Sequence, residues 1–203
     1  MRIETFGVIG AGAIAQAVAR HALNVGHKVT LSNSRGPETL EPLIHELGPG
    51  ASAGTIAEAA QADAVLLAVP WPHIPQALSG LPPWDGRILI DATNHFLTGP
   101  PEFEVADLGE QTGSEVVAGL APGAHVIKAF NTLYAQHIAA DPRHEAGRRV
   151  LFLAGDDAAA AAAFAEWADG LGFAPVNVGD LRTGGRLMQL GGSLSSLHLL
   201  KQG

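Results

Sequence analysis

The chain has 203 residues and a mass of 20.9 kDa, which corresponds to one domain or to one domain with a small appendage. Its 12 basic and 20 acidic residues give a net charge of −8, which argues against nucleic acid or an anionic membrane surface as a partner. The sequence contains no cysteine, so disulfides, thiolate metal sites and a cysteine nucleophile are excluded. It shows neither a signal-peptide pattern nor an uncharged apolar window of ~18 residues, so we expect a cytoplasmic protein without a membrane partner.

Short apolar runs alternate with amphipathic runs through the first half of the chain. The spacing predicts strands at 5–9, 28–31, 64–69 and 87–91, and helices at 12–25, 38–47 and 55–60. Thr55, with Glu58 three residues later, matches a capping box at the start of the third helix. Uncharged apolar strands joined by helices favour a parallel sheet that is covered on both faces.

The second half begins with an irregular stretch at 94–112, which contains adjacent prolines and four acidic residues and is predicted to be a loop. Beyond it, the pattern predicts helices at 112–120, 158–171 and 181–200, and strands at 125–130, 150–154 and 174–178. Asp156 and Asp157 are expected to cap the alanine-rich helix, and the last helix is expected to be interrupted near Gly191. Together these elements predict an α/β fold.

A glycine-rich turn stands between the first strand and the first helix and has the G-x-G-x-x-A form. Its residues are Gly10, Ala11, Gly12, Ala13, Ile14 and Ala15. Gly10 permits the tight turn, and Gly12 lets backbone amides approach a pyrophosphate at the positive N-terminus of the helix. Without a ligand the same residues would form a plain strand–turn–helix corner. In this context they predict a dinucleotide site and a Rossmann-type, doubly wound, mostly parallel sheet.

The end of the second strand indicates which dinucleotide binds. NAD-type sites carry an acidic residue ~20 residues after the glycines, where it bonds to the ribose hydroxyls. Here that position is Ser32, and the segment continues with Asn33, Ser34 and Arg35 without an acid. Hydroxyl, amide and guanidinium groups suit a 2′-phosphate, so we expect NADP(H) and not NAD. The alternative is an ordinary polar turn before a helix.

Further candidates stand where other strands end, because ligands of such sheets bind beyond the carboxyl ends of the strands. Val69, Pro70 and Trp71 follow the third strand, Asn94 follows the fourth, and Asn131 follows the strand at 125–130. Each also has a structural interpretation. The prolines and asparagines are common turn formers, and the tryptophan is a natural lid on the core.

The sequence offers no set of general acid–base residues. The one tyrosine, Tyr134, has no lysine four residues later, so the proton relay of short-chain dehydrogenases is absent. The nine histidines show no metal-ligand spacing, and only His137 lies just after a candidate strand end. Lys128, inside an apolar strand, is expected to reach an edge or to pair with an acid. We therefore expect no catalytic side chain and no metal, but direct hydride transfer between two bound cofactors.

Motifs at 10–12, 32–35, 69–71, 128–132, 154–157 and 185–188 span nearly the whole chain. In combination they resemble the NADPH-dependent deazaflavin (coenzyme F-420) oxidoreductases. They are also similar to the cytosolic domains of the six-transmembrane metalloreductases, which share that fold. Where the deazaflavin reductases have a proline-containing segment after the nicotinamide strand, this chain has Leu133, Tyr134 and Ala135.

The resemblance implies a Rossmann domain over 1–135 and a small C-terminal α/β extension over 136–203 that completes a second-cofactor pocket in a homodimer. It also implies that the nicotinamide lies beside 129–135 and that 185–192 border the acceptor. Together with the candidates at the strand ends, the expected cofactor-binding residues are Gly10, Ala11, Gly12, Ala13, Ile14, Ser32, Asn33, Ser34, Arg35, Val69, Pro70, Trp71, Asn94, Ala129, Phe130, Asn131 and Thr132.

We therefore predict an NADPH-binding oxidoreductase that transfers a hydride between NADP(H) and a second planar cofactor of the deazaflavin type. One alternative is an NADPH-dependent reductase of a flavin, FMN or FAD, or of ferric iron. The other alternative is a binding module that senses NADPH without turning it over. Oxidation of NADPH by any acceptor would indicate one of the two kinds of reductase and not the binding module.

Overall fold

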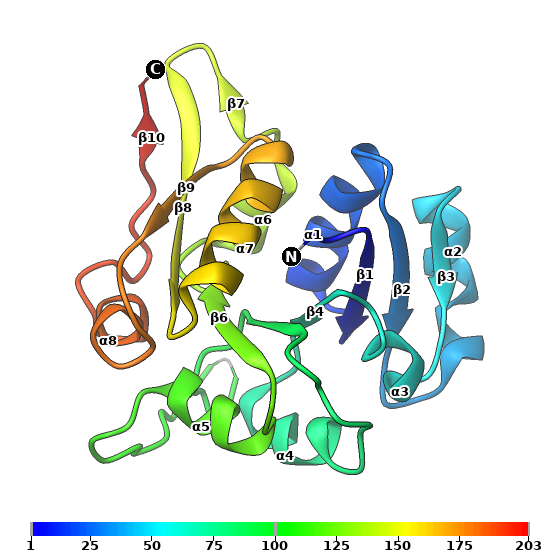
Figure 1. Ribbon diagram of the computed structural model, residues 1–203, viewed down its shortest axis with the longest axis horizontal. Coiled ribbons are helices and arrows are strands. Elements are labelled where there is room, and N and C mark those ends of the chain that lie inside the picture. Colours follow the sequence, from blue (N-terminus) through cyan, green and yellow to red (C-terminus); the bar gives the residue numbers. More distant parts are fainter. Residues whose placement is uncertain (1, 100, 203) are drawn as a thin grey trace.

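Ten strands form one sheet in the computed structural model, which describes residues 2–99 and 101–202 (Figure 1). The strand order is β10-β8-β6-β5-β4-β1-β2-β3, and β7 and β9 also pair with β8. The parallel block comprises β1 (Thr5–Ile9), β2 (Lys28–Ser32), β3 (Ala51–Ala53), β4 (Ala64–Leu67), β5 (Ile88–Asp91) and β6 (His125–Ala129). The other strands are β7 (Arg143–His144), β8 (Gly147–Gly155), β9 (Ala174–Asn177) and β10 (Leu200–Lys201). β8 runs antiparallel to β6 and so joins the C-terminal strands to the parallel block.

Helices cover both faces of this sheet. Apolar residues of α1 (Ala13–Asn24), α6 (Ala135–Ala139) and α7 (Ala158–Gly170) belong to one buried cluster. A second cluster contains residues from or beside α3 (Ile56–Ala59), α4 (Ile74–Leu78) and α5 (Gly113–Leu120). The other helical elements are η1 (Pro37–Leu40), α2 (Glu41–Leu47), η2 (Trp71–His73) and α8 (Thr183–Met188). This arrangement confirms the predicted α/β fold with a doubly wound, mostly parallel sheet.

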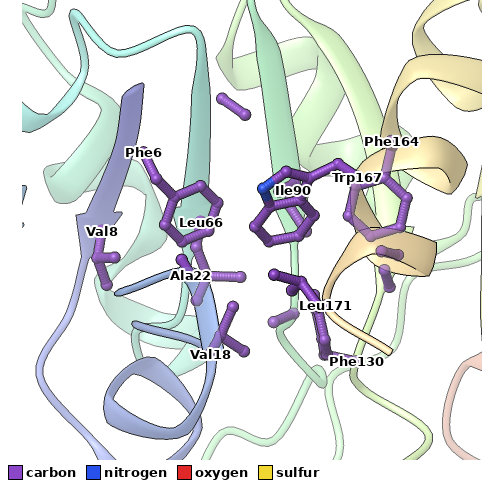
Figure 2. Close-up of a cluster of buried hydrophobic side chains, with 14 of the residues drawn as sticks. Phe6, Val8, Val18, Ala22, Leu66, Ile90, Phe130, Phe164, Trp167 and Leu171 are labelled. Atoms are coloured by element: carbon purple, nitrogen blue, oxygen red, sulfur yellow. The ribbon is translucent and has the colours of Figure 1, made fainter. Parts of the chain in front are cut away.

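The two halves of the chain share one core. Figure 2 shows Trp167 of α7 facing Phe6 of β1, and these two rings stack with centroids 4.8 Å apart. The Trp167 indole also donates a hydrogen bond of 3.1 Å to the imidazole of His27. Phe130, from the end of β6, packs edge-on against Phe164 at 6.1 Å. Because these rings are buried together, the C-terminal strands are held against the nucleotide half of the fold.

The predicted helix starts are confirmed at three places. Thr55 and Thr112 each accept a hydrogen bond from the backbone N–H three residues later, and the glutamate at that position completes both capping boxes. The carboxylate of Asp157 accepts the Ala160 N–H at 2.7 Å and caps α7. Local sequence is sufficient for these features, because a cap depends only on groups within one turn.

The predicted helix over 181–200 is wrong in its second half. Only Thr183–Met188 is helical; the chain then turns, and Leu200–Lys201 forms β10 on β8. Gln189, the C-cap, has an extended ψ of 171° and ends the helix, and Gly191 then adopts a left-handed φ of +81° in the turn that follows. The predicted helix at 38–47 is divided into η1 and α2, and the short elements β3, α4, α6 and β7 were not predicted. Elements of two to five residues are too short to show a hydrophobic period.

None of the helices within the described ranges combines the length and the apolarity that crossing a membrane demands.

Candidate dinucleotide-binding site

A groove opens where the winding of the sheet reverses. β1 lies between β2 and β4, and the helices beside these neighbours cover opposite faces, so a crevice forms beyond the carboxyl ends of the strands. Two adjoining cavities of about 880 Å³ and about 530 Å³ occupy this edge. The larger, called here the polar lobe, is lined by residues 33–37; the smaller, the aromatic lobe, is lined by Trp71, Phe96 and Phe103. Both are lined by Gly12, Ala68, Val69, Pro70 and His73. The shared lining makes them one continuous groove.

The two loop glycines have different physical roles. Gly10 has a φ of +119°, and a Cβ there would lie 2.3 Å from the Ala68 carbonyl oxygen, so the fold itself requires glycine. Gly12 has an ordinary φ of −76°, and a Cβ there would meet nothing within 4 Å because it would point into open space. As the N-cap of α1, Gly12 also supplies no side-chain cap, and the first turn carries no acid. The N-terminal amides of α1 are therefore available to an anion.

The polar lobe carries the predicted phosphate-binding side chains. The Asn33 carboxamide accepts the backbone N–H of Arg35 at 2.9 Å and donates to the Thr39 hydroxyl at 2.9 Å, which fixes the shape of this turn. The Arg35 side chain is exposed, and within residues 2–99 and 101–202 no acid or acceptor engages its guanidinium. Ser34 lies beside it at the groove. Ser32 is fully buried and donates to the Val8 carbonyl at 2.8 Å, so its side chain does not line the groove.

The aromatic lobe is built from the end of β4 and from the loop at 94–112. Val69, Pro70 and Trp71 line it from one side, and Asn94 follows β5. The loop contributes Phe96, Leu97 and Phe103, and a single antiparallel bridge between Phe96 and Val105 gives it more regularity than predicted. The spacing of residues in the sequence did not predict that Phe96 and Phe103 would line the groove.

His95 packs behind this lobe. Its ring lies edge-on to Trp71 with centroids 6.1 Å apart. Burial, and secondarily the positive charge of Lys128, lower the pKa of His95 below its ordinary value. The imidazole is therefore neutral at pH 7, and it supports Trp71 without adding charge to the groove.

Four predicted site residues stand at the end of β6, and two of them point into the core. Ala129 and Phe130 are fully buried, and Phe130 adopts a φ of +66° while its ring packs between Phe164 and Phe173, so neither side chain lines the groove. A bulky residue in the left-handed region is strained and persists only where packing holds it. The strained turn leads into Asn131 and Thr132 at the carboxyl edge of the sheet.

Asn131 joins three segments at this edge. Its Nδ2 donates to Asn94 Oδ1 at 3.1 Å and to the Met188 carbonyl at 2.8 Å, and Asn94 Nδ2 donates to the Asn131 carbonyl at 3.2 Å. Asn131 Oδ1 and Thr132 Oγ1 are buried without a hydrogen-bond partner in the part of the chain that the structure describes. Neither residue lines the two cavities of the groove, so this edge of the sheet holds two enclosed oxygens beside Asn94 whose hydrogen-bonding capacity is unmet.

A buried ion pair holds the turn that follows β5. Lys128 donates to Asp91 at 3.0 Å and to the Thr93 carbonyl, which confirms the expectation that this lysine pairs with an acid. Asp91 also accepts the Ser114 hydroxyl at 2.6 Å and both the N–H and the hydroxyl of Thr93. Burial opposes the charge of Asp91, but the Lys128 ammonium and the hydrogen bonds from Ser114 and Thr93 outweigh it and hold the pKa of Asp91 below its ordinary value. Because Lys128 and Asp91 both bond to Thr93, the ion pair fixes the position of the next residue, Asn94.

Thr55, Ile56, His73 and Gln76 are among the residues that line the polar lobe without having been predicted as site residues. Thr55 and Ile56 stand at the start of α3, His73 ends η2, and Gln76 lies in α4. Within residues 2–99 and 101–202, no group of three or more histidine, aspartate or glutamate side chains has a geometry that could hold a metal ion.

Residues 5–95 match the family described as NADP oxidoreductase coenzyme F420-dependent. The matched segment begins with β1, contains the glycine-rich loop and Arg35, and ends just after Asn94. The match covers less than half of the 203 residues, and it includes the strands, the glycine-rich loop and the polar turn that line the polar lobe. Phe96 and Phe103 of the aromatic lobe lie beyond the matched segment.

Individual relatives extend the comparison beyond that segment. Metalloreductase STEAP3 from Rattus norvegicus is 30% identical over 177 residues, which are 86% of this chain and 34% of the relative, so the chain spans about a third of the length of that curated protein. A hypothetical protein from Sinorhizobium meliloti is 41% identical, with a TM-score of 0.91 over 100% of this chain and 97% of the other. A protein from Arthrobacter sp. FB24, proposed to be an F420-dependent NADP reductase, shares the fold at 23% identity, with a TM-score of 0.71 over 88% and 86% of the two chains.

Proposed function

We propose that this protein binds NADPH along the groove and transfers a hydride between the nicotinamide and a second planar cofactor of the deazaflavin type. The observation that carries the proposal is the continuity of the groove from Arg35, whose guanidinium has no partner among the described residues, past the open Gly12 to the aromatic lobe. NADPH has the same sequence of groups: a 2′-phosphate at its adenosine end, a pyrophosphate in the middle, and the planar nicotinamide at the other end. The family adds support because its members are NADP oxidoreductases.

The residues of the groove fit this cofactor. The backbone over 10–14 and the first turn of α1 would hold the pyrophosphate, and Asn33, Ser34 and Arg35 would hold the 2′-phosphate. The orphaned oxygens of Asn131 and Thr132 would accept N–H groups of the nicotinamide carboxamide, which accounts for their lack of a protein partner. Ser32, Ala129 and Phe130 would contribute through backbone position, because their side chains point into the core.

Bound NADPH supplies the hydride, and the protein needs no acid or base for that transfer. The role of the chain is to hold the nicotinamide at a fixed face and to exclude water from it. Trp71, Phe96 and Phe103 form an apolar wall at the end of the groove where the ring would lie. The ion pair of Lys128 and Asp91 keeps that wall in register with the end of β6.

We also propose the division at residue 135 and a role for the C-terminal part in the acceptor pocket, in a cytoplasmic homodimer. The hydrogen bond from Asn131 to the Met188 carbonyl brings α8 to the carboxyl end of β6, beside the proposed nicotinamide position. Leu197, Leu199 and Leu200 leave an apolar strip exposed on the last segment, which is available for a second copy. Light scattering on the purified protein measures the oligomeric state directly.

Replacing Arg35 with alanine should raise the Kd for NADPH about 10–100-fold, because a charge-assisted hydrogen bond to the 2′-phosphate contributes about 1.5–3 kcal/mol. Binding of NADH, which lacks that phosphate, should be nearly unchanged. Arg35→Lys keeps the charge but not the fork of donors and should be intermediate. Arg20→Ala serves as the control, since Arg20 is engaged by Glu46 at 2.6 Å. Equal loss of affinity for both nucleotides would refute the assigned role of Arg35.

Anaerobic oxidation of NADPH, followed at 340 nm, tests the reaction itself. Deazaflavin coenzyme F-420, FMN, FAD and a ferric chelate are supplied in turn as acceptors. Reduction of the deazaflavin supports the proposed acceptor class. Turnover with only a flavin or ferric iron would instead favour the second candidate function, a flavin or ferric reductase, which the similarity to metalloreductase STEAP3 supports. Tight NADPH binding without any turnover would identify a sensing module.

A further inference from the structure

Arg149, on β8, is a buried cation without an anion. Its residue is 8% exposed, and no carboxylate in residues 2–99 and 101–202 lies within 4.0 Å of its guanidinium. Its Nη2 contacts His144 Nε2 at 3.0 Å, and its Nε is buried with no partner among the described residues. Proteins rarely bury arginine unpaired, because the desolvation cost is recovered only when an anion and good hydrogen bonds are present.

His144 Nε2 accepts a hydrogen bond from Arg149 Nη2, and the other groups near this guanidinium are imidazole and phenol rings. The His137 and His198 rings meet edge-on with centroids 4.2 Å apart, and Tyr134 lies 5.1 Å from His198. Both ring nitrogens of His198 are buried without partners in the described ranges. Burial, then the charges of His137 and Arg149, lower the pKa of His198. We call Tyr134, His137, His144, Arg149 and His198 the Arg149 cluster.

The cluster stands beyond the carboxyl end of β6. The antiparallel register pairs Ala129 with Leu153, so Arg149 lies farther along β8, past the point where β6 ends. Tyr134 and His137 come from the segment that leaves the same strand end through Asn131. His144 also lines an open hollow of about 820 Å³, together with Arg148, Lys201 and the acidic Glu145. Of the cluster, only His144 lines this hollow; His144 and Tyr134 are the members whose side chains face solvent.

We propose that the Arg149 cluster binds an anionic oxygen group, a phosphate or a carboxylate. Arg149 supplies the fixed charge and the N–H of its Nε, and His137 and His198 supply further donors. His144 holds the guanidinium through its Nε2, and Tyr134 stands at the exposed rim. A metal ion does not account for the cluster, since the described residues contain no group of three side chains able to ligate one. Two sources share this chemistry: free phosphate, and the phosphate of a flavin-type acceptor whose ring lies toward Asn131. Only the second source rests on the proposed function.

The equilibrium test needs neither NADPH nor turnover. Inorganic phosphate is titrated into the full chain at constant ionic strength, with chloride as the reference salt, and binding is followed by calorimetry and by the Tm. We expect saturable binding that Arg149→Met weakens about 10–100-fold, the loss of one charge-assisted contact. Arg148→Met is the matched control, because its guanidinium is already engaged by Asp169 at 2.7 Å. His198→Phe keeps a ring but removes both nitrogens, and it should weaken phosphate binding severalfold.

Thermal stability distinguishes a loss of phosphate binding from damage to the fold. Without phosphate, Arg149→Met should melt no lower than the wild-type chain, because it removes a buried charge that has no anionic partner among the described residues. Phosphate binding that is the same in wild type, Arg149→Met and His198→Phe, or that is no stronger than chloride binding in all three, overturns the proposal.

A second experiment identifies whether the anion is a free phosphate or the phosphate of the acceptor. FMN and riboflavin carry the same ring and differ by one phosphate, so their KM values with NADPH isolate its contribution. A lower KM for FMN that disappears in Arg149→Met, with riboflavin unaffected, places the acceptor phosphate at the cluster. Equal KM values, with phosphate binding intact in the first test, assign the cluster to a free anion. If neither flavin is turned over, the flavin-reductase candidate fails and the equilibrium test still decides the anion site.

Discussion

Replacing Gly12 with valine is expected to abolish NADPH binding while the protein still folds. The two effects separate because Gly12 has an ordinary φ of −76° and a Cβ there meets no protein atom within 4 Å. The branched side chain would instead occupy the space that both lobes share, where the pyrophosphate would approach the amides of α1. Titration of NADPH by fluorescence and a thermal melt by circular dichroism measure the two quantities on one sample.

Two variants control this experiment. Gly119→Val places the same side chain at an exposed position of α5 where a Cβ also meets nothing, so it should bind NADPH normally. Gly12→Ala adds a single methyl group and should lose part of the affinity. Normal NADPH binding by Gly12→Val would mean that the cofactor does not cross the glycine-rich loop, and the proposed placement would be wrong.

Replacing Lys128 with methionine should lower the free energy of unfolding by about 3–5 kcal/mol, which is the usual cost of leaving a buried charge without its partner. Asp91 is fully buried, and Lys128 is its only cationic partner in the described ranges. Adding Asp91→Asn to this variant should recover part of the loss, because the amide needs no counter-charge beside Ser114 and Thr93. Urea denaturation at pH 7 gives the values. A loss below about 1 kcal/mol would show that the hydrogen bonds to Ser114 and Thr93 suffice alone.

The difference in unfolding free energy between the wild-type chain and Lys128→Met should change with pH in one direction. In the wild-type chain the pKa of Asp91 is held below its ordinary value, so the carboxylate contributes stability above that value, and the contribution is lost as the pH falls through the folded-state pKa. Without Lys128, burial dominates and raises the pKa of Asp91, so protonation relieves the folded variant. The gap in unfolding free energy between the two proteins should therefore narrow as the pH falls from 7 toward 4. If the difference in unfolding free energy stays constant or widens as the pH falls, Lys128 does not stabilise the charged form of Asp91.

The nucleotide loop is the part of the site that local sequence predicts best. The turn at Gly10 and Gly12, the helix after it and the polar turn of Asn33 and Arg35 all depend on groups within a few residues, and the structure lines the groove with them. Ser32 shows the limit of that reasoning. Because a parallel strand is buried on both faces, its pattern does not reveal that the Ser32 hydroxyl turns inward to Val8.

The sequence by itself determined the fold class, the position of the glycine-rich loop, the helix caps and the similarity of residues 5–95 to a family of NADP oxidoreductases. Only the tertiary structure decided that Asp91 pairs with Lys128, that Asn94 bonds to Asn131, and that Arg149 is buried among histidines. These contacts join residues on different strands, so they depend on strand order and register. Periodicity along one segment carries no information about which segment lies beside it, and the aromatic lobe and the Arg149 cluster exist only through that pairing.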